Sequence, residues 1–143
     1  MLNLVVFGNS SESTITAEVP HMDGIAIRIV ESGNRKFVEG LDGGPLLQTE
    51  KEVLSLIGIC GENDTNRIML HGSLFPESFF DLKSGNAGMT LQKFVNYHMR
   101  VAAIISPSLI RGKFEEFVRE TNRGNHFRVF HNRDQAEHWL LRD

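Results

Sequence analysis

The chain has 143 residues, a hydrophobic share of 41%, a charged share of 23% and a formal net charge of -3. This length fits one domain with a buried core, and the even spread of charges is typical of an ordinary globular protein. The sequence shows no cluster of lysine and arginine, the residues that hold phosphate-rich partners, so we expect neither a nucleic acid nor an anionic membrane surface as a partner.

Residues 1–22 open with a short apolar run, followed by a serine-rich stretch. The run has no basic flank and is much shorter than the about 20 apolar residues that a membrane span needs. We therefore expect neither a targeting signal nor a span here. The segment is predicted to be an N-terminal extension that forms an added edge strand or packs on a partner subunit. Residues 23–143 form the predicted domain.

The domain opens with two strand-like segments, residues 25–30 and 35–40, separated by a turn sequence that contains Gly33. This arrangement predicts a β-hairpin. Thr49 and Glu52 have the spacing of a capping box, which predicts the start of a helix. The predicted buried stripe of that helix is Val53, Leu54, Ile57 and Cys60.

Two short apolar runs, residues 67–70 and 100–105, lack polar alternation and are predicted to be buried parallel strands. Apolar residues at helical spacing predict helices over residues 87–98 and 110–121. A last strand over residues 126–130 and a helix capped by Asn132 follow. The predicted core side chains on these helices are Leu91, Phe94, Phe114, Phe117 and Trp139.

This order of elements predicts an α/β fold in a single domain. We expect a mixed, mostly parallel sheet of about five strands, with an opening β-hairpin and about four helices. Cys60 is the single cysteine, so no disulfide within the chain and no cysteine metal cluster is predicted. Its apolar neighbours favour a buried thiol, and this cysteine usage is typical of the reducing cytoplasm, the predicted location.

The middle third of the chain carries the series FFDLK, AG, QKF, NY and, further on, ETNRG. In this series the chain resembles an uncharacterised bacterial family of domains of unknown function, from about residue 23 to the C-terminus. More distantly it is similar to the STAS and sporulation anti-sigma-antagonist domains, through residues 38–42, the loop at residues 81–88 and QAEHWL near the end. The resemblance implies a STAS-like fold. Those domains place a serine beside the aspartate, whereas here Leu82 and Lys83 separate Asp81 from Ser84.

The loop at residues 81–88 leads into a predicted helix and is the predicted binding surface. A helix N-terminus favours anions, its glycines permit close approach, and its lysine can balance a negative charge. The same residues are also typical of a plain helix cap. The predicted ligand- or partner-binding residues are Asp81, Lys83, Ser84, Gly85, Asn86 and Gly88.

Two function classes follow from these residues. The first is a non-enzymatic, STAS-like binding or regulatory domain whose partner is a protein or a small or lipid-like ligand; a homodimer is compatible with it. The alternative is a small hydrolase-type enzyme that uses loops after the third and fourth strands, with His71, Asp81, Lys83 and Ser106 as acid-base candidates. The histidines form no metal-ligand pair, so neither a metal site nor another cofactor is predicted.

Overall fold

The computed structural model describes residues 3–8, 13–22, 25–41 and 47–142. The strands are β1 (Asn3–Gly8), β2 (Ser13–Met22), β3 (Ile25–Ser32), β4 (Arg35–Gly40), β5 (Arg67–His71), β6 (Arg100–Ile104) and β7 (Phe127–Phe130). The helices are α1 (Glu50–Glu62), α2 (Glu77–Phe80), α3 (Asn86–Asn96), α4 (Gly112–Thr121) and α5 (Arg133–Leu141). Three single 3-10 turns accompany them: η1 (Gly72–Leu74), η2 (Leu82–Ser84) and η3 (Pro107–Leu109).

The strands form one mixed sheet in the order β1-β2-β3-β4-β5-β6-β7. Pairing is antiparallel from β1 to β4 and parallel from β4 to β7. The predicted α/β class is confirmed, since the five expected strands are β3 to β7 and the expected hairpin is β3–β4. Gly33 in the hairpin turn has a φ of 63°, a conformation that glycine adopts without steric cost. The proposed division at residue 22 stays a prediction.

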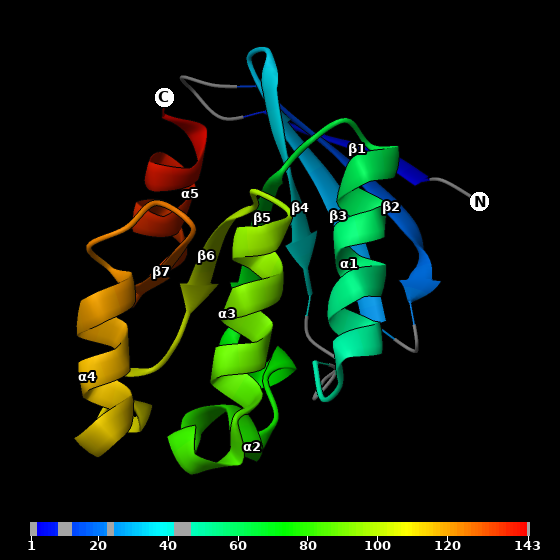
Figure 1. Cartoon of the computed structure of the whole chain (residues 1–143). Helices are drawn as coiled ribbons and strands as arrows, with labels where there is room; N and C mark the ends of the chain where they lie inside the picture. The colour runs from blue at the N-terminus through cyan, green and yellow to red at the C-terminus, as the bar shows by residue number, and fades with distance from the viewer. Residues whose placement is uncertain (1–2, 9–12, 23–24, 42–46, 143) are drawn as a thin grey trace.

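Helices cover both faces of the sheet (Figure 1). One face packs against α1, α3 and α4, the helices of the strand-helix-strand crossovers, and holds the larger hydrophobic core. The other face packs against α5 and holds a smaller cluster around Phe37, Met69 and Trp139. Helix α5 follows the last strand and packs on the opposite face of the sheet. Its N-terminal residue Arg133 thereby lies beside Glu39 of β4.

Several local predictions hold and some fail. The capping box of α1 forms, with the backbone N–H of Thr49 donating to Glu52 at 2.9 Å. In α1, Leu56 is buried, whereas the predicted Leu54 is only partly buried, because it lies at the edge of the helix face that packs against the larger core. The helix predicted to reach residue 98 ends at Asn96.

The predicted core side chains divide in the same way. Phe94, Phe114 and Trp139 are buried. Leu91 and Phe117 are partly buried and pack against the edge of the larger core. Cys60 is buried, and this burial raises the pKa of its thiol to about 12.

Candidate functional site

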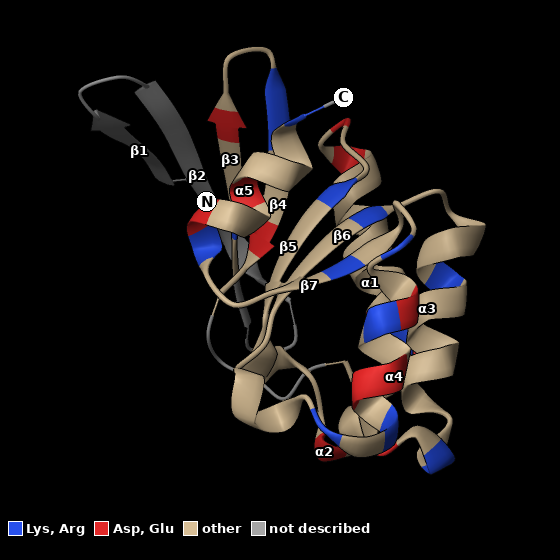
Figure 2. Ribbon diagram, turned by 90° about the vertical axis from the view of Figure 1, so that its left-hand side faces the viewer, with Lys and Arg blue, Asp and Glu red and all other residues tan. Residues whose placement is uncertain are grey.

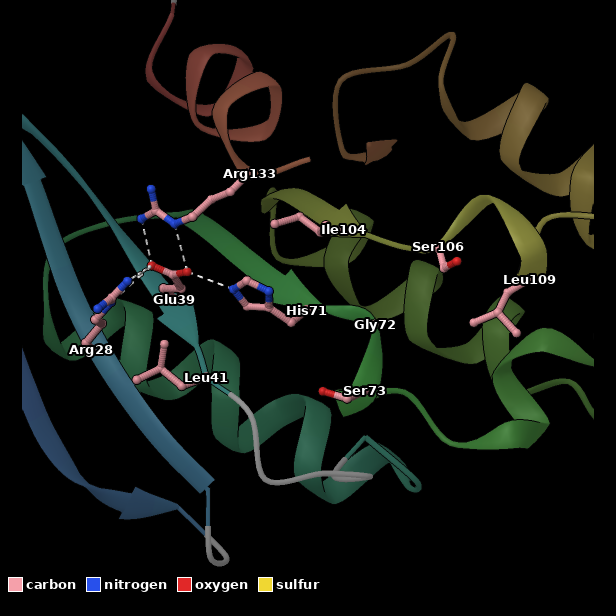
Figure 3. Close-up of a pocket in the computed structure, with 10 residues that line it drawn as sticks. All are labelled: Arg28, Glu39, Leu41, His71, Gly72, Ser73, Ile104, Ser106, Leu109 and Arg133. Carbon is pink, nitrogen blue, oxygen red and sulfur yellow. Dashed lines mark hydrogen bonds and ion pairs between the residues drawn. The ribbon is translucent and has the colours of Figure 1, made fainter. Parts of the chain in front are cut away.

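An open pocket of about 570 Å³ lies at the carboxyl ends of β4, β5 and β6, on the face that α5 covers (Figure 3). Its lining residues are Arg28, Glu39, Leu41, His71, Gly72, Ser73, Ile104, Ser106, Leu109 and Arg133. Ligands of parallel α/β sheets gather at this edge, because the loops that leave the strands open outward there. The pocket is therefore the candidate functional site.

Side chains alternate between the two faces of a strand, and this alternation brings the charged side chains of the site to the pocket face of the sheet. In β4, Phe37 lies under α5, so Glu39, two residues on, points to the same face. Arg28 of β3 is the direct antiparallel partner of Glu39. His71 is the last residue of β5, and a Cβ at the following Gly72 would lie 3.0 Å from the Ile104 carbonyl oxygen. Glycine therefore lets the chain leave β5 close to β6.

Glu39 is the centre of the site and its side chain is 1% exposed. Its Oε1 accepts hydrogen bonds from Arg28 Nε at 3.1 Å and from Arg133 Nη2 at 2.8 Å. Its Oε2 accepts from Arg133 Nε at 3.1 Å and lies 2.8 Å from His71 Nε2. A buried carboxylate is stable only when its lone pairs are satisfied in this manner.

The electrostatics follow from that geometry. Burial raises the pKa of Glu39, but hydrogen bonds from His71 and Arg133 and the charges of Arg133 and Arg28 outweigh it and lower the pKa to about 2. Glu39 is therefore an anion under all ordinary conditions. The hydrogen bond from Glu39 likewise raises the pKa of Arg133, against the effect of burial. This carboxylate serves to fix cations and is too acidic to act as a proton carrier near neutral pH.

The cations around Glu39 reach into the pocket. The side chains of Arg28, His71 and Arg133 are 26%, 33% and 34% exposed, and Figure 3 shows them converging on Glu39 from three elements. Arg133 also lies 3.6 Å from Glu137 on the helix side. Within the described residues, the other ring nitrogen of His71 and Nη1 of Arg28 have no hydrogen-bond partner. Nη1 of Arg28 is a donor that a ligand would meet, whereas the second ring nitrogen of His71 is a donor only when the ring is protonated, because Nε2 carries the hydrogen directed at Glu39.

The structure separates the sequence-predicted acid-base candidates. His71 and Ser106 line the pocket, whereas Asp81 and Lys83 are not among its lining residues. Asp81 instead precedes the η2 turn, where its carboxylate accepts the Lys83 backbone N–H at 3.2 Å. Among the described residues, the hydrogen bond of the His71 side chain is with Glu39, and the Ser106 hydroxyl lies 3.0 Å from that of Ser108.

The loop at residues 81–88 is held by its own hydrogen bonds. The Ser84 hydroxyl donates to the Ser78 carbonyl and accepts the Asn86 backbone N–H at 3.1 Å. Gly85 has a φ of 82° directly before α3. Asn86 is buried and donates to the Gln48 carbonyl at 3.1 Å, while Gly88 is exposed. The Ser84 hydroxyl therefore ties the loop to the start of α3.

Sequence reasoning missed Arg28, Glu39 and Arg133. One signal was present: a period of two from Phe37 puts Glu39 on the inward face of its strand, where an acid needs a partner. The partners could not be read in the same way, because Arg133 is 94 residues away. In the described part of the chain no group of three or more His, Cys, Asp or Glu side chains is placed to hold a metal ion. None of the helices described is long and apolar enough to cross a membrane.

A family model described as a domain of unknown function, DUF4180, matches residues 32–140. The match covers most of the chain, and the chain belongs to this family. No curated protein and no solved structure gave a significant match. Membership agrees with the resemblance to a family of domains of unknown function and carries no activity with it.

Proposed function

We propose that this DUF4180 domain binds a small organic anion, with a carboxylate or phosphate head and a short apolar body, in the pocket at the carboxyl ends of β4, β5 and β6. The observation that carries this proposal is the buried Glu39, which orients two guanidinium groups and an imidazole at the pocket wall. Guanidinium groups held in this way bind carboxylates and phosphates with little loss of side-chain entropy. Leu41, Ile104 and Leu109 supply apolar lining for the body of such a ligand.

Charge supports the same ligand class. Glu39 neutralises one of its two arginines, and Glu137 lies 3.6 Å from Arg133. These two carboxylates balance Arg28 and Arg133, so the net positive charge at the pocket is that of His71 whenever its ring is protonated, while Arg28 offers a guanidinium hydrogen-bond donor beside it. An incoming anion would pair with these groups without displacing Glu39.

The contacts of His71 favour binding over catalysis. A serine hydrolase needs a hydroxyl within about 2.6–3.2 Å of the histidine that activates it. The described hydroxyl groups make no such contact with His71, whose hydrogen bond is to Glu39. The proposal is therefore a non-enzymatic binding domain, and the lone buried Cys60 supports its location in the cytoplasm.

The test is a binding panel of small carboxylates and phosphate monoesters, followed by thermal shift and calorimetry. We expect at least one to bind the wild type and to bind Arg28→Gln about tenfold more weakly, since one charge-assisted hydrogen bond is lost. Arg119→Gln is the matched control, because Arg119 is 64% exposed on α4. Equal binding to Arg28→Gln would overturn the proposal. If the wild type hydrolyses an ester substrate and His71→Ala does not, hydrolysis would replace binding as the function of the pocket.

A second candidate, contact with a protein partner at residues 81–88, is favoured by Gly88. This residue lies inside α3 and is exposed, and a Cβ there would have no heavy atom within 4 Å. Glycine costs a helix about 1 kcal/mol relative to alanine, so the chain's own packing does not explain it, whereas close approach of a partner would. The distant similarity to the switch loop of STAS domains points to the same surface.

The variants Ser84→Ala and Ser84→Asp test this second candidate. If the loop binds a partner, the set of proteins that copurify with Ser84→Asp should differ from that of the wild type, because the added charge disturbs the hydrogen bonds to Ser78 and Asn86. If both variants retain the same copurifying proteins and Ser84→Ala only loses roughly 0.5–2 kcal/mol of stability, the loop is a cap.

A further inference from the structure

Four arginines gather at the opposite end of the sheet from the pocket. Arg67 and Arg100 are the first residues of β5 and β6 and are direct register partners, and Arg128 is the second residue of β7. Arg142 follows the end of α5. Figure 2 shows the basic segments of β5, β6 and β7 side by side. The four residues, called the arginine cluster below, are far apart in the sequence and meet only because the parallel strands start at one edge.

Part of the arginine cluster caps α5. Arg67 Nε donates to the Leu140 carbonyl at 2.7 Å and Arg100 Nη2 donates to the Trp139 carbonyl at 2.6 Å, and Arg35 of β4, outside the cluster, donates to the Leu141 carbonyl. The end of a helix carries roughly half a negative charge, so these guanidinium groups already exceed what it needs. Arg128 and Arg142 have no bond to that helix end among the described residues. Capping therefore does not account for the cluster.

The positive charge of the cluster is not compensated within the described chain. No carboxylate there forms an ion pair with any of the four arginines. Burial, followed by the nearby charges of Arg67, Arg142 and Arg128, lowers the pKa of Arg100. About four positive charges thus face roughly half a negative charge at the helix end and the carboxylate of Asp134, which lines the adjacent pocket. The net charge of the whole chain is -3, yet positive charge is concentrated at the arginine cluster.

Trp139 forms the floor of the cluster. The guanidinium carbons of Arg100 and Arg128 lie 4.0 and 5.2 Å from the centroid of its ring. Trp139 is 3% exposed, and neither its Nε1 nor Arg100 Nε has a hydrogen-bond partner in the described structure. A pocket of about 430 Å³ opens beside the ring, and its lining residues are Arg128, Phe130, Trp139 and Arg142, together with Asp134, Gln135 and His138 of α5. It shares no lining residue with the Glu39 pocket.

We propose that the arginine cluster is a second binding site, which takes a compact oligophosphate, either inorganic or as the phosphate chain of a nucleotide. Guanidinium groups bind phosphate oxygens in pairs of hydrogen bonds, and a chain of two or three phosphates brings three to four negative charges into a small volume, on the order of the charge of the cluster. The small pocket that Arg128 and Arg142 line, and the negative charge of the whole chain, favour a short ligand over a nucleic acid, which needs an extended basic surface.

The test uses tripolyphosphate, pyrophosphate and ATP with the full-length protein. Trp139 is the single tryptophan, so its fluorescence reports on the cluster, and calorimetry gives the affinity. We expect tripolyphosphate to bind at low salt and to bind Arg142→Gln and Arg128→Gln each about tenfold more weakly. Arg142 lies beyond α5, so its replacement leaves the fold intact, as circular dichroism will verify. Tighter binding of ATP than of tripolyphosphate identifies the nucleotide as the source, and equal binding identifies the inorganic chain.

Two controls separate this proposal from the others. Arg119→Gln removes an exposed arginine from α4 and should bind tripolyphosphate like the wild type. Arg28→Gln belongs to the Glu39 pocket and should leave the affinity reported by Trp139 fluorescence unchanged, so that failure of one site does not decide the other. No binding of tripolyphosphate at low salt, an equal loss in Arg119→Gln, or far tighter binding of an RNA oligonucleotide would overturn the proposal.

Discussion

Glu39→Gln gives the most direct test of the physical account of the pocket. The substitution keeps the shape of the side chain and removes its charge. Arg28 and Arg133 then face a neutral amide, which can accept at one oxygen only, and the NH₂ group of glutamine points a donor at other donors. Because Glu39 is 1% exposed, water cannot replace the lost bonds.

The size of the effect follows from the pKa. Burial raises the pKa of Glu39, but the hydrogen bonds and charges around it lower the value from 4.5 to about 2. This drop corresponds to about 3 kcal/mol of stability carried by the charged form. The loss agrees with the about 3–5 kcal/mol that removal of one member of a buried ion pair costs. Since the folded pKa is the lower one, this stability is present above about pH 5 and is lost as the pH falls toward 2.

Urea unfolding, followed by circular dichroism at neutral pH and near pH 3, measures both quantities. We expect Glu39→Gln to lose about 3 kcal/mol at neutral pH and the gap to the wild type to narrow on acidification. Glu115→Gln is the matched control, because Glu115 is 55% exposed in a surface pair with Arg119 and should cost under about 0.5 kcal/mol. A loss below about 1 kcal/mol in Glu39→Gln, or the same pH dependence in both proteins, would refute the reasoning.

Three further predictions concern single side chains. Gly88→Ala should raise the free energy of unfolding by roughly 0.5–1 kcal/mol, since the new methyl group meets open space on α3; a loss of stability would contradict this. Phe94→Ala should cost about 3–5 kcal/mol in thermal unfolding, and Phe117→Ala should cost less because it is only partly buried, so equal losses would speak against the packing described. Cys60 should react with a thiol reagent only when the protein unfolds, because burial raises its pKa to about 12; fast labelling of the native protein would show it to be accessible.

The elements with local signals could be predicted from the order of residues alone. The capping box at Thr49, the turn at Gly33 and the helical spacing of Phe94 act within a few residues, so they predict a helix start, a hairpin and a buried helix face without knowledge of the rest. The order of these elements then restricts the fold to a mixed α/β sheet with right-handed crossovers. His71 and Ser106 were candidates on the same basis, because they follow apolar strands.

The contacts of those residues depend on how the elements pack in three dimensions. Alternation in β4 puts Glu39 on the inward face, but its partners Arg28, His71 and Arg133 come from β3, β5 and α5 and meet it only in the folded chain. The depth of a side chain in the core, which separates Phe94 from Phe117, likewise depends on how a neighbouring helix is seated.

The arginine cluster likewise could not be predicted from the sequence. Along the chain Arg67, Arg100 and Arg128 are isolated charges, and an argument from sequence clusters finds no basic surface. Parallel pairing aligns the starts of β5, β6 and β7, and α5 lays Trp139 beneath them, so the fold makes one site from single residues about thirty positions apart. Electrostatic energy depends on distance in space, and that distance is a property of the strand register and not of the order of residues.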